Sequence, residues 1–243
     1  MFYEPKGKGS HGLPRDPFRS LVVPRPIGWI STVSSAGVVN LAPYSFFNAV
    51  SYAPPMVMFA ANGQHAEGGH KDTLSNILET GEFVVNVATW ELREEINASS
   101  AAVPRAVDEM MMAGLEAAPA KLVRPPRVKA SPVHFECVPV KTVELPADDP
   151  EAPNNIVFGR VVGIHISDDI LTDGLVDMSK FRPIGRLGYF DYTVVDNVFT
   201  MPRPKVEEVM AAPAAERGAA RPPRPGVRST PLSGVTSRIG LRR

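Results

Sequence analysis

The stretch RPIGWISTVSSAGVVNLAPYSFFNAVSYAPPMVMFA, residues 25–60, carries the clearest strand signals in the chain. Residues 25–34 and 38–51 are rich in β-branched and aromatic residues, and the short Ser-Ala-Gly segment between them is typical of a hairpin turn. The Pro54-Pro55 pair then interrupts the pattern before a further apolar run at 56–61. The stretch therefore predicts three strands, of which the first two pair as a hairpin.

Later segments continue this pattern, with only short helices between the strands. Further strands are predicted at 83–89, 131–145 and 154–167. A parallel βαβ sheet would place a helix after nearly every strand, so the fold class is predicted to be mainly β with short helices, arranged as an antiparallel barrel. The sequence contains no GxGxxG, GxxxxGK[ST] or HExxH pattern, so the usual dinucleotide, nucleoside triphosphate and zinc-protease signatures are absent.

The segment HKDTLSNILETGEFVVNV, residues 70–87, predicts a short helix that leads into the strand at 83–89. Leu74, Ile77 and Leu78 share one helical face, which indicates a docked helix over residues 73–80. Asp72 or Thr73 fits the N-cap position, and Gly81 is suited to end the helix.

The start of this predicted helix is also a suitable cradle for a phosphate. Its first turn would expose unpaired backbone N–H groups, and Lys71 adds a full charge beside the hydroxyls of Thr73 and Ser75. Taken alone, the segment is explained more simply as an ordinary capped helix with a solvated lysine.

Composition indicates one main domain with appendages and a cytoplasmic location. The 243 residues are 44% hydrophobic, which suffices for one substantial core. Residues 1–17 form an N-terminal arm without the apolar segment of a signal peptide, and no apolar run is long enough to span a membrane. Cys137 is the only cysteine, which excludes an internal disulfide and a thiolate metal cluster, so redox chemistry would need an organic cofactor.

No metal site is predicted. The five histidines, His11, His65, His70, His134 and His165, show no metal-ligand spacing. His134 and His165 fall in predicted strands, where a structural role is expected.

Residues 201–243 differ in composition from the predicted main domain at 18–200. This tail holds nine Lys or Arg residues against three acids, with seven prolines and no aromatic residue. Such a composition buries little against a core, so we expect an extended tail that is solvated or lies along a partner subunit. Clustered arginine also suits nucleic acid, but without aromatic residues to stack on bases the solvated or partner-bound tail is the favoured interpretation.

Four segments in one order define a family resemblance. They are residues 25–60, the run KDTLSNILETGEFVVNV, the strand around NIVFGRVVGI and the late FRPIGRLGYFDY. Together they resemble the flavin reductase-like family of FMN-binding split β-barrel proteins, over roughly residues 18–195. The resemblance implies an antiparallel, Greek-key split barrel that binds FMN and forms a homodimer.

The resemblance also assigns residues to the FMN site. Ser31 and Thr32 would lie near the isoalloxazine and ribityl parts, the segment 43–48 would meet the ring edge and the ribityl-phosphate, and Lys71 with its two neighbours would hold the phosphate. The positions assigned are Ser31, Thr32, Pro43, Tyr44, Ser45, Phe46, Phe47, Asn48, Lys71, Asp72, Thr73, Arg186 and Tyr189, the last two as residues that close the site.

Plainer interpretations compete at several of these positions. Trp29, Phe46 and Phe47 suit a barrel core, and strand alternation points Phe46 and Phe47 to opposite faces, so at most one faces inward. Ser31 and Thr32 suit ordinary strand positions. Arg25 suits a surface charge as well as a phosphate ligand, and Pro43 suits a break or bulge in its strand.

The implied function is electron transfer through FMN. The resemblance indicates an FMN-dependent NAD(P)H:flavin oxidoreductase that passes electrons from NADH or NADPH to an acceptor or a partner monooxygenase, with no catalytic acid or base. Residues 187–190 read LGYF where some relatives carry a Gly-Asp-His type segment linked to nicotinamide binding, which favours the alternative, a flavoredoxin-type electron carrier. Weaker alternatives are a pyridoxamine-phosphate-oxidase-like split barrel and a nucleic-acid binder that uses the tail.

Overall fold

The computed structural model describes residues 1–5 and 9–211, and the chain divides into two compact units, Met1–Val198 and Phe199–Arg243. In the second unit the described residues contain the helix α6 (Val206–Ala211). Residues 212–243, on which most of the tail prediction falls, lie outside the described residues. The sheets and cavities below belong to the first unit.

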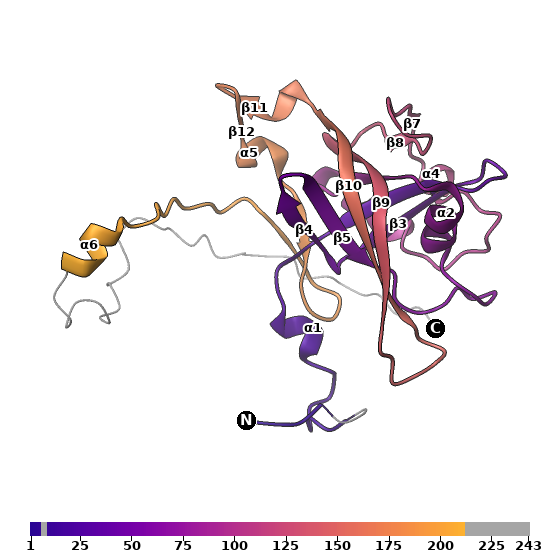
Figure 1. Cartoon of the computed structure of the whole chain (residues 1–243), viewed down its shortest axis with the longest axis horizontal. Coiled ribbons are helices and arrows are strands. Elements are labelled where there is room, and N and C mark those ends of the chain that lie inside the picture. The colour runs from indigo at the N-terminus through magenta and orange to yellow at the C-terminus, as the bar shows by residue number, and fades with distance from the viewer. Residues whose placement is uncertain (6–8, 212–243) are drawn as a thin grey trace, which may run out of the picture. The chain divides into compact units, whose positions relative to one another are not determined.

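One antiparallel sheet of seven strands forms the body of the first unit, in the order β3-β2-β6-β9-β10-β5-β4 (Figure 1). Neighbouring strands pair antiparallel throughout this sheet. The strands are β2 (Gly28–Val33), β3 (Val39–Tyr44), β4 (Phe47–Tyr52), β5 (Pro55–Ala60), β6 (Phe83–Val87), β9 (Val133–Leu145) and β10 (Asn154–Ile166).

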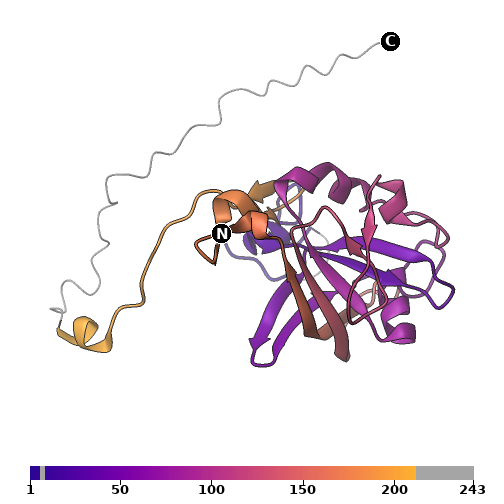
Figure 2. The same ribbon diagram turned by 90° about the horizontal axis from the view of Figure 1, so that it is seen from above.

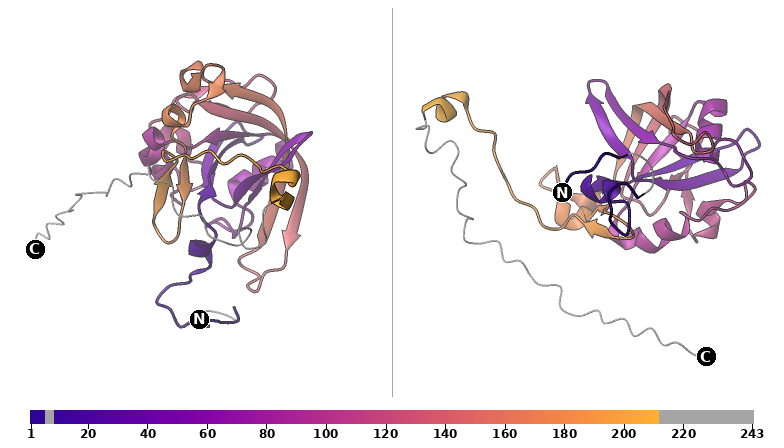
Figure 3. Two further views of the ribbon diagram at one scale, coloured as in Figure 1. Left: turned by 90° about the vertical axis from the view of Figure 1, so that its left-hand side faces the viewer. Right: turned by 90° about the horizontal axis from the view of Figure 1, so that it is seen from below.

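The sheet closes on itself because its two end strands are consecutive in the chain. Only Ser45 and Phe46 separate β3 from β4, so the ends of the seven-strand order must lie beside each other. The left view of Figure 3 shows the strands surrounding a common interior, and Figure 2 shows the β4–β5 and β9–β10 hairpins side by side. The predicted antiparallel split β-barrel is therefore confirmed.

The predicted strand at 38–51 is wrong in one respect, because the chain splits it between opposite ends of the sheet. The break falls at Ser45 and Phe46, and Pro43 lies within β3, paired with Trp29 of β2. Pro43 is tolerated there because β3 is an end strand, where a missing N–H costs no ladder hydrogen bond. The predicted break at Pro43 is therefore replaced by a corner two residues later.

Two apolar clusters lie on the two sides of β2, whose residues are buried on both faces. Ile30, Phe59 and Phe83 belong to the cluster inside the barrel. Trp29 and Leu41 belong to the second cluster, together with Ile27, Leu92, Ile96, Met110 and Ile184. Trp29 is thus core, as its plainer interpretation predicted.

The helices of the first unit are short. They are α1 (Phe18–Leu21), α2 (Asp72–Thr80), α3 (Arg93–Ala98), α4 (Glu109–Met112) and α5 (Met178–Phe181), with single 3-10 turns at Trp90–Leu92 and Asp168–Ile170. Helix α2 contributes Leu74 and Ile77 to the cluster inside the barrel. Helices α2 and α4 both lie against β3 (Figure 1). Among the described residues, no helix has the length and apolar character needed to cross a bilayer.

The predicted helix at 73–80 is present as α2, with two corrections at its details. Lys71 occupies the N-cap position without a side-chain cap bond, so Asp72 and Thr73 are the first helical residues. Leu74 and Ile77 are buried as predicted, but Leu78 is 57% exposed, because the buried face of this helix is narrower than its apolar residues suggest. Gly81 ends the helix at φ 71°, and its N–H donates to Ile77 O at 2.9 Å.

A second, three-stranded sheet brings the end of the domain back to its beginning. It contains β1 (Arg25–Pro26), β13 (Ile184–Arg186) and β14 (Tyr192–Val194) in that order, and its register pairs Arg25 with Arg186. Two further pairs of short strands are β7 (Ala117–Ala118) with β8 (Arg127–Val128) and β11 (Leu171–Thr172) with β12 (Leu175–Val176).

Candidate functional site

Two adjoining cavities lie where the β3–β4 corner, the start of α2 and the β13–β14 segment meet. The larger, of about 420 Å³, is lined by Arg19, Arg25, Ile27, Pro43, Ser45, Phe46, Ala60, Asn62, Lys71, Ile96, Ser100, Arg186, Leu187, Tyr189 and Tyr192. The smaller, of about 170 Å³, is lined by Asn40, Ala42, Pro43, Tyr44, Gln64, His65, Ala66, Lys71, Asp72, Thr73, Ser99, Ser100, Ala101, Ala102, Val103 and Glu109. Pro43, Lys71 and Ser100 line both, so the two cavities are neighbours.

Lys71 stands at the boundary between the two cavities. It precedes the first residue of α2, and its Cε lies about 4.0 Å from where a side chain on Gly63 would begin. Burial lowers the pKa of its ammonium group. Its side chain makes no hydrogen bond or ion pair with any of the described residues. A partly desolvated cation without a protein partner is suited to an anionic ligand.

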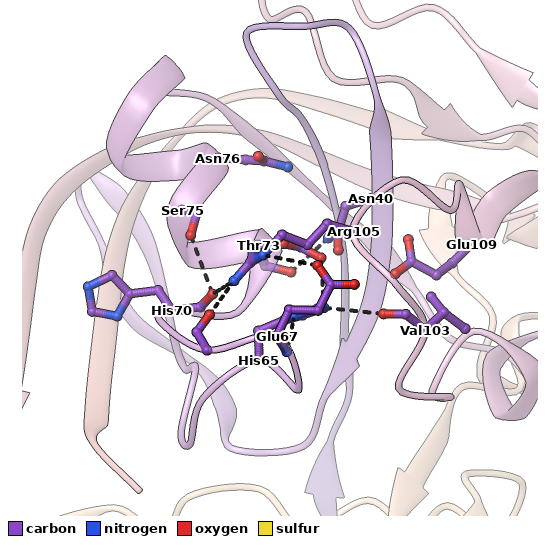
Figure 4. Close-up of polar contacts among 12 residues, drawn as sticks. Asn40, His65, Glu67, His70, Thr73, Ser75, Asn76, Val103, Arg105 and Glu109 are labelled. Atoms are coloured by element: carbon purple, nitrogen blue, oxygen red, sulfur yellow. Dashed lines mark hydrogen bonds and ion pairs between the residues drawn. The ribbon is translucent and has the colours of Figure 1, made fainter. Parts of the chain in front are cut away.

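Asp72 faces a different partner, Arg105, whose polar surroundings Figure 4 shows. Its carboxylate accepts a short hydrogen bond from Arg105, and its second oxygen lies 3.4 Å from His65 Nε2. Arg105 also donates to Gly68 O at 2.6 Å and to His70 O at 3.0 Å. The Arg105 side chain thereby ties the loop before α2 to the first turn of the helix.

The hydroxyl of Thr73 is hydrogen-bonded to another residue of the protein. Thr73 is buried, and its Oγ1 accepts from Asn40 Nδ2 at 2.8 Å. Burial raises the pKa of the Tyr44 phenol, and the nearby Glu109 and Asp72 carboxyls raise it further. Tyr44 therefore stays protonated and serves as a hydrogen-bonding wall of the smaller cavity.

Glu109 is a buried carboxyl group in this wall that the sequence interpretation missed. Its Oε2 accepts from Leu41 N at 3.0 Å, so it caps a backbone N–H of the end strand β3. Burial raises the pKa of Glu109, and the Leu41 N–H opposes this shift. No local sequence pattern predicts this role of Glu109, because the contact joins α4 to β3 across 68 residues.

Three arginines line one part of the larger cavity. Arg25 is only 6% exposed, so its interpretation as a surface charge is wrong. Arg186, opposite Arg25 in the β1–β13 register, donates to Tyr189 O at 2.5 Å and lies 4.4 Å from the centroid of the Tyr192 ring. Tyr189 has a positive φ of 54°, which turns the 187–190 loop toward Arg186. Arg19 of α1 completes this group, and the sequence interpretation missed it.

Of the residues assigned by resemblance, nine line the two cavities and four do not. Pro43, Tyr44, Ser45, Phe46, Lys71, Asp72, Thr73, Arg186 and Tyr189 are brought together. Phe47 packs against the barrel core, close over Gly28, while Phe46 lines the larger cavity. Asn48 is exposed and accepts from the N–H of Ala49 at 2.9 Å.

Ser31 and Thr32 are buried in polar contacts within the protein. Ser31 donates to Pro126 O at 2.6 Å and accepts from Asn86 Nδ2 at 3.1 Å. Thr32 Oγ1 accepts from Asn76 Nδ2 at 3.0 Å, which joins β2 to α2. These contacts give both residues a role in packing β2, and their assignment to the flavin remains a prediction.

The two strand histidines have protein partners. His134 Nε2 donates to Val128 O at 2.8 Å, and His165 Nε2 lies 2.5 Å from the buried Glu136 carboxylate. Across the part of the chain that the structure describes, no group of three His, Cys, Asp or Glu side chains could hold a metal ion. Cys137 is buried, and burial raises the pKa of its thiol, so it is a poor nucleophile.

Comparison with known proteins identifies the class. The family described as flavin reductase like domain matches residues 18–185, and the chain belongs to this family. A protein of Aquifex aeolicus is 42% identical over 169 residues, which are 69% of this chain and 83% of the relative.

Two solved structures support the same assignment. Nitrilotriacetate monooxygenase component B from Bacillus cereus superposes with a TM-score of 0.74 at 27% identity, over 83% of this chain and 98% of that one. The 2-nitrobenzoate 2-nitroreductase of Pseudomonas fluorescens superposes with a TM-score of 0.67 at 27% identity, over 78% of this chain and 89% of that one. The chain therefore contains a flavin reductase-like domain, of a family that includes oxidoreductases.

Proposed function

We propose that the chain binds FMN across the two cavities, with the phosphate at Lys71 and the flavin ring against Pro43 and Phe46. The observation that carries this proposal is Lys71 itself, a partly desolvated cation that has no hydrogen-bond or ion-pair partner among the described residues and lines both cavities at the start of α2. A dianionic phosphate needs such a cation, together with the free N–H groups of a first helical turn.

The other lining residues fit the rest of the cofactor. Ile27, Pro43 and Phe46 offer apolar surface to a planar ring. The amide oxygen of Asn62 is buried without a hydrogen-bond partner among the described residues, so it is free to accept from an N–H group at the ring edge. Asp72 acts indirectly in this proposal, because its carboxylate is held by Arg105 and would repel a phosphate.

The proposed activity is that of an FMN-dependent oxidoreductase. Bound FMN would accept two electrons from NADH or NADPH and release them to an acceptor. The chain's own residues bind and orient the ligands and exclude water, and no acid or base is needed from them. We propose a partner monooxygenase as acceptor, because the B. cereus neighbour is a monooxygenase component.

An electron carrier of flavoredoxin type is the second candidate. It is favoured by the 187–190 loop, where Tyr189 and Phe190 are exposed and stack near the Arg15 guanidinium at 5.5 and 5.6 Å. This loop reads LGYF where some relatives carry a Gly-Asp-His type segment linked to nicotinamide binding. The two candidates differ in whether NADH or NADPH reduces the flavin directly.

We further propose a homodimer. The outer face of β10 carries exposed apolar side chains, with Val162 at 38%, Ile164 at 55% and Ile166 at 49% exposure. Phe158 of the same strand pairs with Met58 of β5, which extends the apolar surface across the neighbouring strand. A second copy of the chain is a suitable cover for a surface of this kind.

The test is to purify the protein, identify any bound flavin by absorbance and mass, and measure NADH and NADPH oxidation. Apoprotein is titrated with FMN and FAD in parallel. We expect tighter FMN binding, because the second nucleotide of FAD has no counterpart in the phosphate cradle. Equal or tighter FAD binding, or no flavin binding, would contradict the proposal, and bound FMN without NAD(P)H oxidation would favour the carrier.

A further inference from the structure

The larger cavity contains a group of three arginines that hold neither the phosphate nor the ring in the proposed FMN site, although the family resemblance assigns Arg186 to closing it. Arg19, Arg25 and Arg186 come from α1, β1 and β13, and the β1–β13 register places the last two opposite each other. Among the described residues that line this cavity, none is an aspartate or a glutamate. The three positive charges therefore share one wall without an acidic neighbour in it.

The hydrogen bonds of these arginines leave their charges uncompensated. Arg25 donates to the carbonyl oxygens of Arg19, of Val22 at 2.8 Å and of Leu187 at 2.8 Å, so its contacts are with neutral groups. Arg186 likewise donates to the Tyr189 carbonyl oxygen. The Arg19 guanidinium makes no hydrogen bond, ion pair or ring contact with any residue in the described part of the chain.

The positive charges of the three arginines repel one another. The pKa of Arg25 is lowered by burial, then by the charges of Arg186 and Arg19, which shows that the three groups lie within electrostatic range. Like charges gathered in a concave, partly desolvated wall raise the free energy of the folded protein. Binding of an anion would relieve this cost.

Lys71 does not belong to this group. It also lines the smaller cavity at the start of α2, whereas none of the three arginines lines that cavity. The cavity thus holds two separate positive sites, one at Lys71 and one at the arginines. A single phosphate at Lys71 leaves the arginine site free.

We propose that Arg19 and Arg186 bind the phosphate or carboxylate group of the second ligand, the aromatic molecule that exchanges electrons with the flavin. This inference rests on the proposed function and names the substrate class of the same site. Guanidinium groups suit both oxyanions, because their planar donors pair with two oxygens at once. The Tyr189 and Tyr192 rings beside them suit an aromatic ligand. Arg25 has a positioning role, since its donors hold the backbone of α1 and of the 187–190 loop.

The test compares charged and uncharged probes by calorimetry on the full chain. One pair is NADP⁺ and N-benzylnicotinamide, which lacks phosphates, and the other is 2-nitrobenzoate and nitrobenzene. The variants are Arg19→Gln with Arg186→Gln, the conservative Arg186→Lys, and Arg160→Gln as a matched control that is exposed and lines neither cavity. FMN and riboflavin affinities are measured for every variant.

We expect the double variant to weaken the charged member of one pair about tenfold or more, with the uncharged member, FMN and the Arg160→Gln protein unchanged. Arg186→Lys should retain part of the affinity. A response of the dinucleotide pair identifies a phosphate of the electron donor, and a response of the nitro pair identifies the carboxylate of an acceptor.

Three results would overturn the inference: no change in either pair, an equal loss for charged and uncharged members, or a loss of FMN affinity with riboflavin unchanged. The last would show that the arginines hold the cofactor phosphate. Because heat reports binding with or without flavin, a chain that binds no flavin would refute the proposed function alone, while arginine-dependent binding of a charged probe would still support the anion site.

Discussion

Substitution of Lys71 by methionine separates the phosphate from the rest of the cofactor. Methionine preserves most of the unbranched stem that passes Gly63 and removes only the ammonium group. Lys71 has no hydrogen-bond or ion-pair partner among the described residues, so its removal leaves no protein group newly unpaired. The fold is therefore expected to survive this change.

The magnitude follows from the position of the side chain. A hydrogen bond between charged groups contributes about 1.5 to 3 kcal/mol. Lys71 is half-buried, so solvent and salt screen it less than a surface lysine. The FMN affinity should fall about tenfold to 150-fold on this scale. Riboflavin, which has no phosphate, should lose almost nothing, because the ring contacts at Pro43 and Phe46 are untouched.

The assay is a titration of apoprotein with FMN and with riboflavin, followed by flavin fluorescence, together with thermal unfolding of each variant. Lys141→Met is the matched control, because Lys141 is exposed on β9 and lines neither cavity. Lys71→Arg should retain part of the FMN affinity. The phosphate assignment is refuted if Lys71→Met loses FMN and riboflavin equally, or loses neither while remaining folded.

Three further predictions concern assembly, packing and pH. Ile164→Asp places a charge on the exposed apolar face of β10 and should turn a dimer into a monomer in light scattering, whereas a wild-type monomer with full flavin binding would contradict the dimer. Gly159→Ala should destabilise the fold by about 1 to 3 kcal/mol in urea unfolding, because its new Cβ would lie 2.3 Å from Phe83 Cζ inside the barrel, and an unchanged midpoint would show that the ring can move aside. Burial lowers the pKa of His134 from 6.5 to about 4. Between these two pH values the unfolded state binds more protons than the folded state, so the free energy of unfolding should fall by up to about 3 kcal/mol as the pH drops from 6.5 to about 4. His134→Gln should flatten this dependence, and an equally steep curve in the variant would exclude His134 as its source.

The barrel could be predicted because its signals are local. Residues 25–34 and 38–51 announce a hairpin by composition, and the structure pairs Ser31 with Leu41 in that hairpin. The corner at Ser45 and Phe46 could not be predicted, since the bend there is fixed by which strands lie at the ends of the sheet. No property of the two residues distinguishes them from a continuing strand.

The arginine group likewise could not be predicted from a local sequence pattern. Arg25 and Arg186 are 161 positions apart, and only the pairing of β1 with β13 makes them neighbours. Glu109 reaches β3 in a similar way, through the placement of α4. Contacts of this kind depend on tertiary structure, which a single sequence does not encode in any local pattern.

The segment Lys71-Asp72-Thr73 shows how three consecutive residues of one predicted motif take different partners in the structure. Successive residues in a helix point about 100° apart, so three neighbours at a helix start meet different partners. Lys71 lines both cavities, Asp72 faces Arg105, and Thr73 is buried against Asn40. A binding motif of consecutive residues is therefore better understood as one ligand-facing position supported by two positions that hold it in place, and the phosphate contact of this chain should depend on the charge of Lys71 more than on that of Asp72.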